Sequence, residues 1–497
     1  FANDGGFDVM CGNPPWDKLQ MEDEKWFVGK DDGIVKAANQ AARNRLVSNL
    51  QNTNPSLYKE YIEASEEIAC QSNFVKNSGR FTLTNHGKIE LSSLFAEHCL
   101  NSTKEAWGLV IPTGIAINDS NKDFFAKLID ENRLISLYDF ENKEALFDIH
   151  RMFKFCLLTA GKQQEKTREV KGAFYLTRLD HLLDPNRVYT LQTADFSRLN
   201  PNTKTCPIFR TRRDAELTAK IYRNSVIVMN EETGSNPWDI RFGSTFNMAS
   251  DSHLFETYQS LSDKGAEIID GNLFYLNNFT YVPLYEGKMF WLYNHHYGTW
   301  PIDGERPNTI DSPELSDLMN TDSTIMPWYW VREDLVRDNQ IKRDSDGNII
   351  QSWNHKWIIA FRKLTNATNE RTMVLSAMPG TFGAGHSTTL LCVESGAIPG
   401  ALLIAMLSSL TFDYTVRQKV GGTNLSHFFF KQFPVIERST ITETIEMEII
   451  SRVAELTYFN HDLDGWAQEL FDELTPVQQK ELPQLREKEP FIFNPDR

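Results

Sequence analysis

The chain has 497 residues, of which 41% are hydrophobic and 24% charged, and its formal net charge is −16. This composition is typical of a soluble globular protein of roughly two to four domains, and no run reaches the roughly 18 apolar residues that a membrane helix needs. The negative charge disfavours a nucleic-acid partner, but it is uneven. Residues 437–497 hold 14 acidic and 6 basic side chains, whereas residues 150–230 hold 15 basic and 7 acidic. That cationic segment leaves nucleic-acid binding open.

The six cysteines show no CxxC and no paired spacing. We therefore expect neither a metal site nor disulfides, and we expect a reducing, cytoplasmic location. The chain begins without methionine and lacks a secretory leader, and Phe1–Gly6 leads directly into a strand-like segment. From this we expect a fragment of a longer protein.

In the first 180 residues, strand-like runs alternate with helical patterns, which predicts an α/β fold with a largely parallel sheet. The expected strands are Phe7–Cys11, Glu105–Gly114, Leu134–Asn142, Phe153–Gly161 and Gly172–Leu179. The expected helices are Met21–Phe27, Gly33–Asn49, Ser56–Asn77, Lys88–Leu100 and Lys122–Glu131. Ligands of such sheets bind beyond the carboxyl ends of the strands, where Asn13–Trp16 falls.

From about Pro201 the pattern changes to short, aromatic-rich runs, which predicts a second, irregular α/β domain. Its expected elements are paired strands at Trp357–Leu364 and Thr372–Pro379, a packed helix at Gly400–Val420 and a loop and strand at Gly421–Val435. Residues 440–475 look helical and acidic. The glycine-rich stretch Thr381–Thr389 lacks the lysine of a phosphate-binding loop and is interpreted as a turn.

The segment "CGNPPW", residues 11–16, ends the first expected strand with unusual chemistry. A proline has a fixed φ and no N–H, and the residue before a proline is held extended. The Pro14 carbonyl and the Asn13 side-chain oxygen are therefore rigid acceptors that suit an NH₂ group, and Trp16 offers a face for a planar ring. The exocyclic amine of a nucleobase fits this description. Stacking contributes on the order of 1–3 kcal/mol per base, against a few kcal/mol for extruding the base from the duplex.

This segment resembles the Asn/Asp-Pro-Pro-aromatic motif of amino-methyltransferases. Four segments in order resemble large adenine-specific DNA methyltransferases of the type IIG restriction–modification and BREX- or DISARM-like phage-defence systems. They are "GGFDVMCGNPPWDKL", "FDIHRMFKFCLLTAGK" (147–162), "GGTNLSHFFFKQFPV" (421–435) and "KEPFIFNPDR" (488–497). The resemblance implies methyl transfer from S-adenosylmethionine to adenine N6 of a flipped base in double-stranded DNA, with partner subunits an open question. It also implies the C-terminal half of a Rossmann-like methyltransferase sheet, a mixed α/β target-recognition domain and a helical tail.

At matching positions the resemblance implies that Asn13 and Pro14 hold the amine, that Pro15 keeps the loop rigid and that Trp16 stacks on the base. Phe147 is the candidate for the second stacking aromatic. The candidate phosphate contacts are His150, Arg151, Lys154, Arg210, Arg212 and Arg213. The expected domains are a partial catalytic domain (1–200), a target-recognition domain (201–436) and an acidic helical tail (437–497).

The family binds its cofactor chiefly through a glycine-rich loop N-terminal to the Asn-Pro-Pro motif, and nothing precedes Phe1 here. We therefore expect most of the cofactor pocket to lie outside this chain and the chain to be inactive alone. No nuclease motif is evident. Two alternatives remain, a protein glutamine N-methyltransferase and a non-catalytic DNA-specificity module, with cytosine N4 as a nearby substrate. A carbon-5 cytosine enzyme is disfavoured because no Pro-Cys pair occurs.

Overall fold

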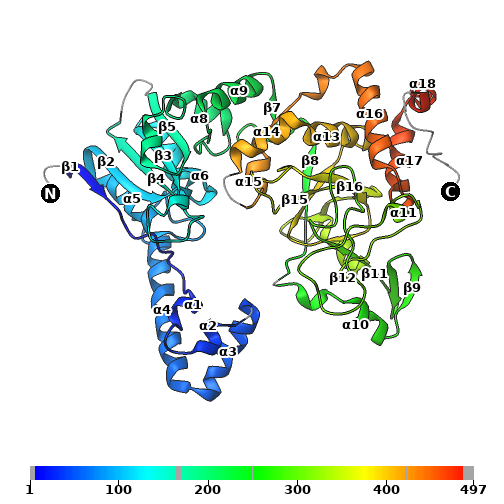
Figure 1. The fold of residues 1–497 in the computed structure, drawn as a ribbon, viewed down its shortest axis with the longest axis horizontal. Coiled ribbons are helices and arrows are strands. Elements are labelled where there is room, and N and C mark those ends of the chain that lie inside the picture. Colours follow the sequence, from blue (N-terminus) through cyan, green and yellow to red (C-terminus); the bar gives the residue numbers. More distant parts are fainter. Residues whose placement is uncertain (1–5, 38, 164–168, 249, 421–422, 485–497) are drawn as a thin grey trace. The chain divides into compact units, whose positions relative to one another are not determined.

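The computed structural model describes residues 6–37, 39–163, 169–248, 250–420 and 423–484 (Figure 1). The chain divides into two compact units, Phe1–Lys220 and Ile221–Arg497. Both units combine helices with sheets, so the predicted mixed α/β fold is confirmed.

Unit 1 is built on one six-stranded sheet. Its order is β1 (Phe7–Gly12), β2 (Thr103–Pro112), β4 (Lys154–Gly161), β3 (Leu134–Glu141), β5 (Glu169–Leu176) and β6 (Tyr189–Gln192). The expectation of a largely parallel sheet is wrong. β1 and β2 are parallel, as are β3 and β5, but β4 runs antiparallel to both of its neighbours. β3 and β4 are neighbours in the sheet, and residues 142–153 connect them as a hairpin without a crossover helix.

Helices of unit 1 occupy two places. One group consists of α5 (Leu91–Ser102), α6 (Gly114–Ile117), α7 (Lys122–Asp130), α8 (Thr193–Leu199) and α9 (Arg212–Arg223), whose last turn crosses the boundary to unit 2. The others form a projection below the sheet in Figure 1, made of α1 (Asp23–Trp26), α2 (Asp32–Val35), α3 (Gln40–Thr53) and α4 (Pro55–Asn77). That projection has its own small core around Phe27 and Ile34.

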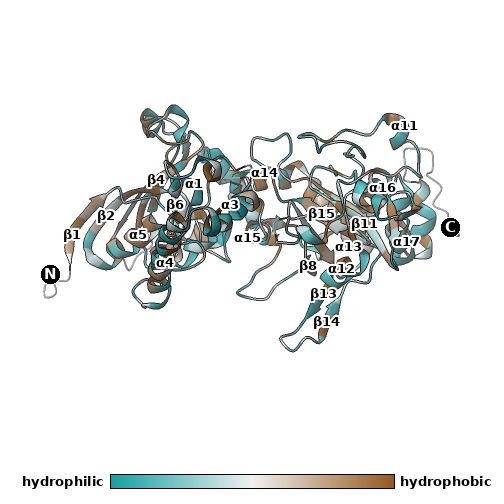
Figure 2. Cartoon of the chain, turned by 90° about the horizontal axis from the view of Figure 1, so that it is seen from below, coloured by the Kyte–Doolittle hydropathy of each residue, from teal (hydrophilic) through white to brown (hydrophobic). Residues whose placement is uncertain are grey.

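β1 is the edge strand of this sheet. Phe7 is 44% exposed and Val9 is 65% exposed, although both are apolar. Figure 2 shows the strand in the colour of hydrophobic residues. Among the described residues, no strand pairs with the outer edge of β1.

Unit 2 contains two larger sheets. One has the order β16 (Leu375–Pro379), β15 (Trp357–Arg362), β18 (Thr388–Val393) and β8 (Ile240–Gly243). The other has the order β12 (Tyr329–Arg332), β11 (Phe279–Tyr285), β10 (Leu273–Leu276) and β9 (Glu267–Asp270), with β17 (Gly383–Ala384) on β11. The prediction of paired strands is confirmed, because β15 and β16 are antiparallel neighbours. The glycine-rich stretch interpreted as a turn supplies β17 and the start of β18.

The helix expected at 400–420 is two helices, α13 (Ala397–Ser408) and α14 (Leu410–Lys419), bent by 64°. Ser409 has extended φ and ψ, and its hydroxyl accepts a hydrogen bond from the N–H of Phe412, so it begins the second helix as an N-cap. Among the described residues no single helix is long and apolar enough to cross a bilayer, and only this bent pair passes on length and composition.

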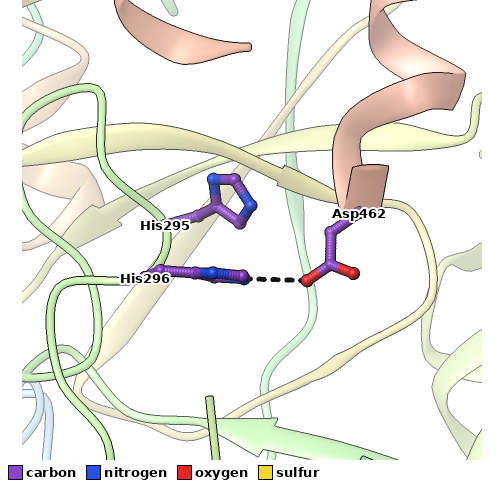
Figure 3. A group of neighbouring side chains, drawn as sticks. All are labelled: His295, His296 and Asp462. Carbon is purple, nitrogen blue, oxygen red and sulfur yellow. Dashed lines mark hydrogen bonds and ion pairs between the residues drawn. The ribbon is translucent and has the colours of Figure 1, made fainter. Parts of the chain in front are cut away.

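The acidic C-terminal region packs into unit 2 rather than standing apart from it. Its helices α16 (Glu443–Thr457) and α17 (Asp464–Glu473) contribute Val453 and Trp466 to the same core as α13. The short turn His461–Leu463 adds a polar contact, because Asp462 Oδ2 lies 2.8 Å from His296 Nε2 (Figure 3). Net charge alone marked this region as a tail, but its apolar positions place it in the core.

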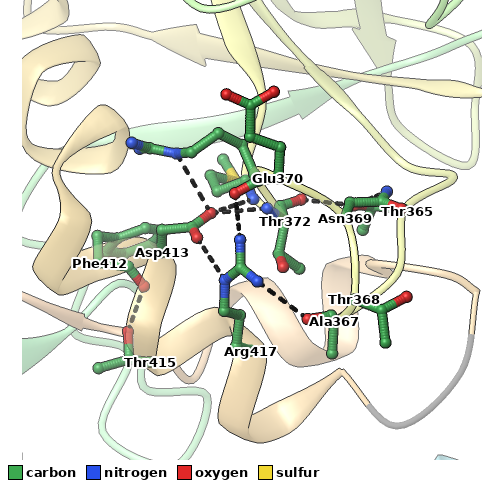
Figure 4. A network of polar contacts seen from close by, with 12 residues as sticks. Thr365, Ala367, Thr368, Asn369, Glu370, Thr372, Phe412, Asp413, Thr415 and Arg417 are labelled. Carbon is green, nitrogen blue, oxygen red and sulfur yellow. Dashed lines mark hydrogen bonds and ion pairs between the residues drawn. The ribbon is translucent and has the colours of Figure 1, made fainter.

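Asp413 of α14 organises a buried polar network (Figure 4). Its carboxylate is 3% exposed and accepts hydrogen bonds from the N–H groups of Thr372 (2.8 Å) and Met373 (2.7 Å). Arg417 Nε donates to the same carboxylate at 2.7 Å. The guanidinium of Arg417 also donates to the carbonyls of Ala367 and Glu370. One carboxylate therefore joins α14 to the segment before β16.

We expect Asp413→Ala to lower the free energy of unfolding by about 3–5 kcal/mol, because it leaves two buried N–H groups without an acceptor and removes the carboxylate that pairs with the partly buried Arg417. Urea denaturation followed by circular dichroism measures this. The control is Asp472→Ala, an exposed residue with one surface hydrogen bond, for which a change below about 0.5 kcal/mol is expected. Equal effects of the two substitutions would contradict the role assigned to Asp413.

Candidate active site

The Asn13–Trp16 loop follows β1 at the carboxyl edge of the sheet. β1 and β2 are parallel, with Gly12 opposite Leu109, so both strands end at this edge. Asn13 is exposed, and its side chain has no hydrogen-bond partner among the described residues. Trp16 is half-buried, and its Nε1–H donates to the carbonyl oxygen of Val110 at 3.1 Å. The structure thus leaves the amide at position 13 open and fixes the indole at position 16.

An aromatic cluster surrounds Trp16. The Phe153 ring is stacked on it, with centroids 5.8 Å apart and planes at 15°, and the Phe155 ring lies at 5.9 Å and 26°. Phe147 meets Trp16 edge-on, at 5.4 Å and 68°, and meets Phe155 edge-on at 4.8 Å. Aromatic pairs of this kind contribute about 0.5–1.5 kcal/mol each beyond their buried area. The cluster therefore holds Trp16 against β4.

The structure brings Phe147, the predicted second aromatic, to Trp16, but in an edge-on arrangement and half-buried. Phe153 lies parallel to the indole and is 41% exposed. Phe153 was not among the aromatic residues predicted from the sequence. The signal was present in Phe153-Lys154-Phe155, because residues two apart in a strand share a face.

Asn142 shapes the loop between β3 and β4, and the sequence analysis missed it. Its side chain is fully buried. Its Oδ1 accepts from the N–H of Phe147 at 2.9 Å, and its Nδ2 donates to the carbonyls of Phe147 (2.9 Å) and Ile149 (3.1 Å). Its backbone N–H donates to the carbonyl of Phe153 at 2.9 Å. One amide side chain therefore satisfies the backbone of the loop that carries the aromatic residues.

A second buried group, Asp139, ties three strands together at the same edge. Its Oδ1 accepts from Thr113 Oγ at 2.5 Å, just after β2, and its Oδ2 accepts from the N–H of Tyr175 in β5 at 3.1 Å. Burial raises the pKa of Asp139, while the Lys154 ammonium and the two hydrogen bonds oppose that rise. Tyr175 adopts φ +57°, a left-handed conformation that a tyrosine rarely takes. This network holds the carboxyl ends of β2, β3 and β5 in register.

Two of the predicted cations meet at Tyr175. Lys154 Nζ lies 4.4 Å from the ring centroid, and the Arg210 guanidinium lies 4.3 Å from it. Lys154 also pairs with Glu141 at 3.4 Å. Burial would raise the pKa of Glu141, but the bond to Lys143 and the charge of Lys154 outweigh it and lower that pKa. Glu141 is therefore ionised, and a phosphate near Lys154 must compete with it.

The remaining predicted cations are dispersed. Arg151 is exposed on the loop and donates to the carbonyl of Lys143 at 2.7 Å. His150 is exposed, and its Nδ1 lies 3.3 Å from the N–H of Met152. Arg212 and Arg213 are exposed at the start of α9, and within the described residues neither contacts Trp16 or Tyr175. The motif at 488–497 lies outside the described residues.

The described residues do not fit the main site of a methyl donor. None of the six strands of unit 1 is followed, within the described residues, by a turn with two or more glycines. The outer edge of β1, where such a site is expected, carries no described strand. The same edge presents the exposed Asn13 amide and the indole of Trp16.

No family model matches the chain, and no curated protein matches it. Several solved structures are similar at low scores. The type ISP restriction–modification enzyme LlaGI with a DNA substrate mimic has 10% identity and a TM-score of 0.41, covering 91% of this chain and 42% of that one. The type IIL enzyme MmeI in complex with DNA has 9% identity and a TM-score of 0.39, covering 96% and 53%. The type IIG restriction endonuclease BpuSI has 13% identity and a TM-score of 0.27, covering 83% and 50%.

The chain thus spans about half the length of these proteins. TM-scores below 0.5 do not establish a shared fold, so the likeness assigns no function to this chain.

We expect Asn142→Ala to loosen the loop at residues 143–152, because it leaves the Phe147 N–H and the Ile149 carbonyl without their partner and removes one of two donors to the Phe147 carbonyl. Hydrogen exchange of the Phe147 amide should accelerate about tenfold or more, while exchange in β2 and β4 stays unchanged. The control is Asp148→Ala, an exposed residue of the same loop. Unchanged exchange in the Asn142 variant would show that the loop is held by other contacts.

Proposed function

We propose that the chain is the target-binding part of a DNA adenine-N6 methyltransferase of a restriction–modification or phage-defence system. The observation that carries the proposal is the exposed Asn13 amide beside a fixed Trp16 ring at the carboxyl edge of the sheet. In this proposal Asn13 Oδ1 and the Pro14 carbonyl oxygen accept the two N–H groups of the adenine amine. Pro15 keeps those acceptors rigid.

The chemical task of these residues is to prepare a weak nucleophile. The lone pair of an exocyclic amine is delocalised into the ring, so the nitrogen is planar and unreactive. Two acceptors on its N–H groups favour a pyramidal nitrogen, whose lone pair then points away from the acceptors. S-adenosylmethionine is the proposed methyl donor. Because the described residues do not fit its main pocket, the role proposed for this chain ends at holding the base and its amine.

The base is proposed to stack between Trp16 and an exposed aromatic of the β3–β4 loop. Phe153 suits this position better than Phe147, because it lies parallel to Trp16 and is open to solvent. A base that enters between Trp16 and Phe153 replaces their direct contact. Stacking at about 1–3 kcal/mol per aromatic offsets part of the few kcal/mol needed to extrude the base.

Phosphate contacts are proposed for Lys154 and Arg210 beside Tyr175, and for Arg151 on the loop. Such contacts position the duplex without specifying its sequence. The reading of base edges is proposed to belong to the second unit, as the target-recognition domain.

A non-catalytic DNA-specificity module is the second candidate. It is favoured by one observation, which is that the described residues do not fit the main site of a methyl donor. The two candidates differ in whether Asn13 affects modification of DNA, so one experiment separates them.

We expect Asn13→Ala to lower methylation on the order of 100-fold, because it removes one of the two acceptors for the amine. The complete gene is expressed in a host that lacks adenine methylation, and modified adenines are mapped by single-molecule sequencing. The wild type should modify adenines in one fixed sequence motif. Asn13→Asp, which retains an acceptor oxygen, should keep part of the activity.

The control is Asp17→Asn, an exposed residue next to the same loop, which should leave modification unchanged. Equal modification by the wild type and Asn13→Ala would contradict the catalytic role of Asn13. An unmodified genome in every case, with DNA binding intact, would favour the specificity module.

A further inference from the structure

A group of metal-ligating side chains lies in unit 2, outside the proposed active site. His295 and His296 belong to the loop after β11, and Asp462 belongs to the turn His461–Leu463 (Figure 3). Two imidazole nitrogens and a carboxylate oxygen, one from each residue, all lie within 4.8 Å of one another. Segments separated by 166 residues in the chain therefore present one set of ligands.

The two imidazoles are buried, and three of their four ring nitrogens lack a hydrogen-bond partner among the described residues. His295 is fully buried, and neither of its ring nitrogens has a hydrogen-bond partner among the described residues. His296 is 1% exposed, and its Nε2 lies 2.8 Å from Asp462 Oδ2 while its Nδ1 has no partner. Leaving a buried polar group unsatisfied costs about 1–3 kcal/mol. Three such atoms in one place indicate that a ligand satisfies them.

The surroundings keep this set in position. The Phe459 ring packs against both imidazoles, with centroids at 4.8 Å from His295 and 5.8 Å from His296. A neutral imidazole has one nitrogen with a free lone pair, which can bind a metal ion.

Asp462 gives the site an access route. Its side chain is 31% exposed and lines a cavity of about 140 Å³. Tyr285 and Asp270 line the same cavity. Water and small cations therefore reach the carboxylate although both histidines are buried.

We propose that His295, His296 and Asp462 bind a first-row divalent transition-metal ion, with a water molecule as a further ligand. Two imidazoles and one carboxylate are a ligand set that Zn²⁺ accepts, and imidazole equally suits neighbouring ions of the series. Zinc bonds of 2.0–2.2 Å place ligand atoms roughly 3.3 Å apart in a tetrahedral site. The ligand atoms, which now lie within 4.8 Å of one another, must move by about 1 Å through side-chain rotations to reach this spacing. Bonds to the ion would then replace the His296–Asp462 hydrogen bond.

Such an ion would join the loop after β11 to the C-terminal helical region. Its binding free energy would add to the stability of unit 2. Cysteine spacing did not predict the site, because no cysteine takes part and the ligands lie far apart in the sequence. The role is independent of methyl transfer.

The test uses the whole 497-residue chain with Zn²⁺ as the probe. After loading and dialysis, elemental analysis should find one zinc per chain, and zinc should raise the melting temperature. Competition with a chelator should show that Asp462→Asn, which keeps the shape of the side chain, weakens zinc binding about 100-fold. His295→Gln should do the same. Circular dichroism checks that each variant is folded.

The matched control is His355→Gln. His355 also pairs with a carboxylate in unit 2, Glu469 at 2.7 Å, but the described residues show no second histidine beside it. This variant should bind zinc like the wild type. The proposal is overturned if the folded wild type binds no Zn²⁺, Co²⁺ or Ni²⁺, or if Asp462→Asn binds zinc as tightly as the wild type. Water then satisfies the buried nitrogens.

Discussion

The fixed position of Trp16 is the constraint on which the rest of the proposed site depends. The indole is held in three ways, by its hydrogen bond to Val110, by its stacking on Phe153 and Phe155 and by the two prolines that precede it. Asn142 in turn holds the loop between β3 and β4, which carries Phe147 and ends at Phe153. Asn13 lies in the same loop as Trp16, and its side chain is exposed. In the proposed function an incoming NH₂ meets this amide, and the base replaces Phe153 on the face of Trp16.

In both units, buried carboxylates join segments that are separate in the chain. Asp139 joins three strand ends in unit 1, and Asp413 joins α14 to the segment before β16 in unit 2. Asp139 accepts one backbone N–H and a hydroxyl, and Asp413 accepts two backbone N–H groups. His295 breaks this pattern, because its nitrogens are buried without described partners. That contrast is what distinguishes a proposed ligand site from an ordinary structural network.

Much of the fold was predictable from local patterns. Apolar runs located β1 to β5 within a few residues, and the pairing of β15 with β16 followed from two adjacent runs. The direction of β4 was not, because an apolar run predicts a strand but not the neighbours with which it pairs. The break between α13 and α14 at Ser409 was not predicted, because the apolar pattern continues across it. In the candidate active site, Asn13 and Trp16 were predicted from a sequence motif. Phe153 and, in unit 2, the histidine pair were not predicted, because their contacts join residues that are distant in the sequence.

The central claim is that the Asn13–Trp16 loop holds the exocyclic amine of adenine. The most direct test is to identify the atom that is modified. DNA from cells that express the complete gene is digested to nucleosides, which are then identified by mass spectrometry. We expect N6-methyladenine that disappears when the gene is deleted. N4-methylcytosine, or unmodified DNA together with methylated glutamine in protein, would contradict it.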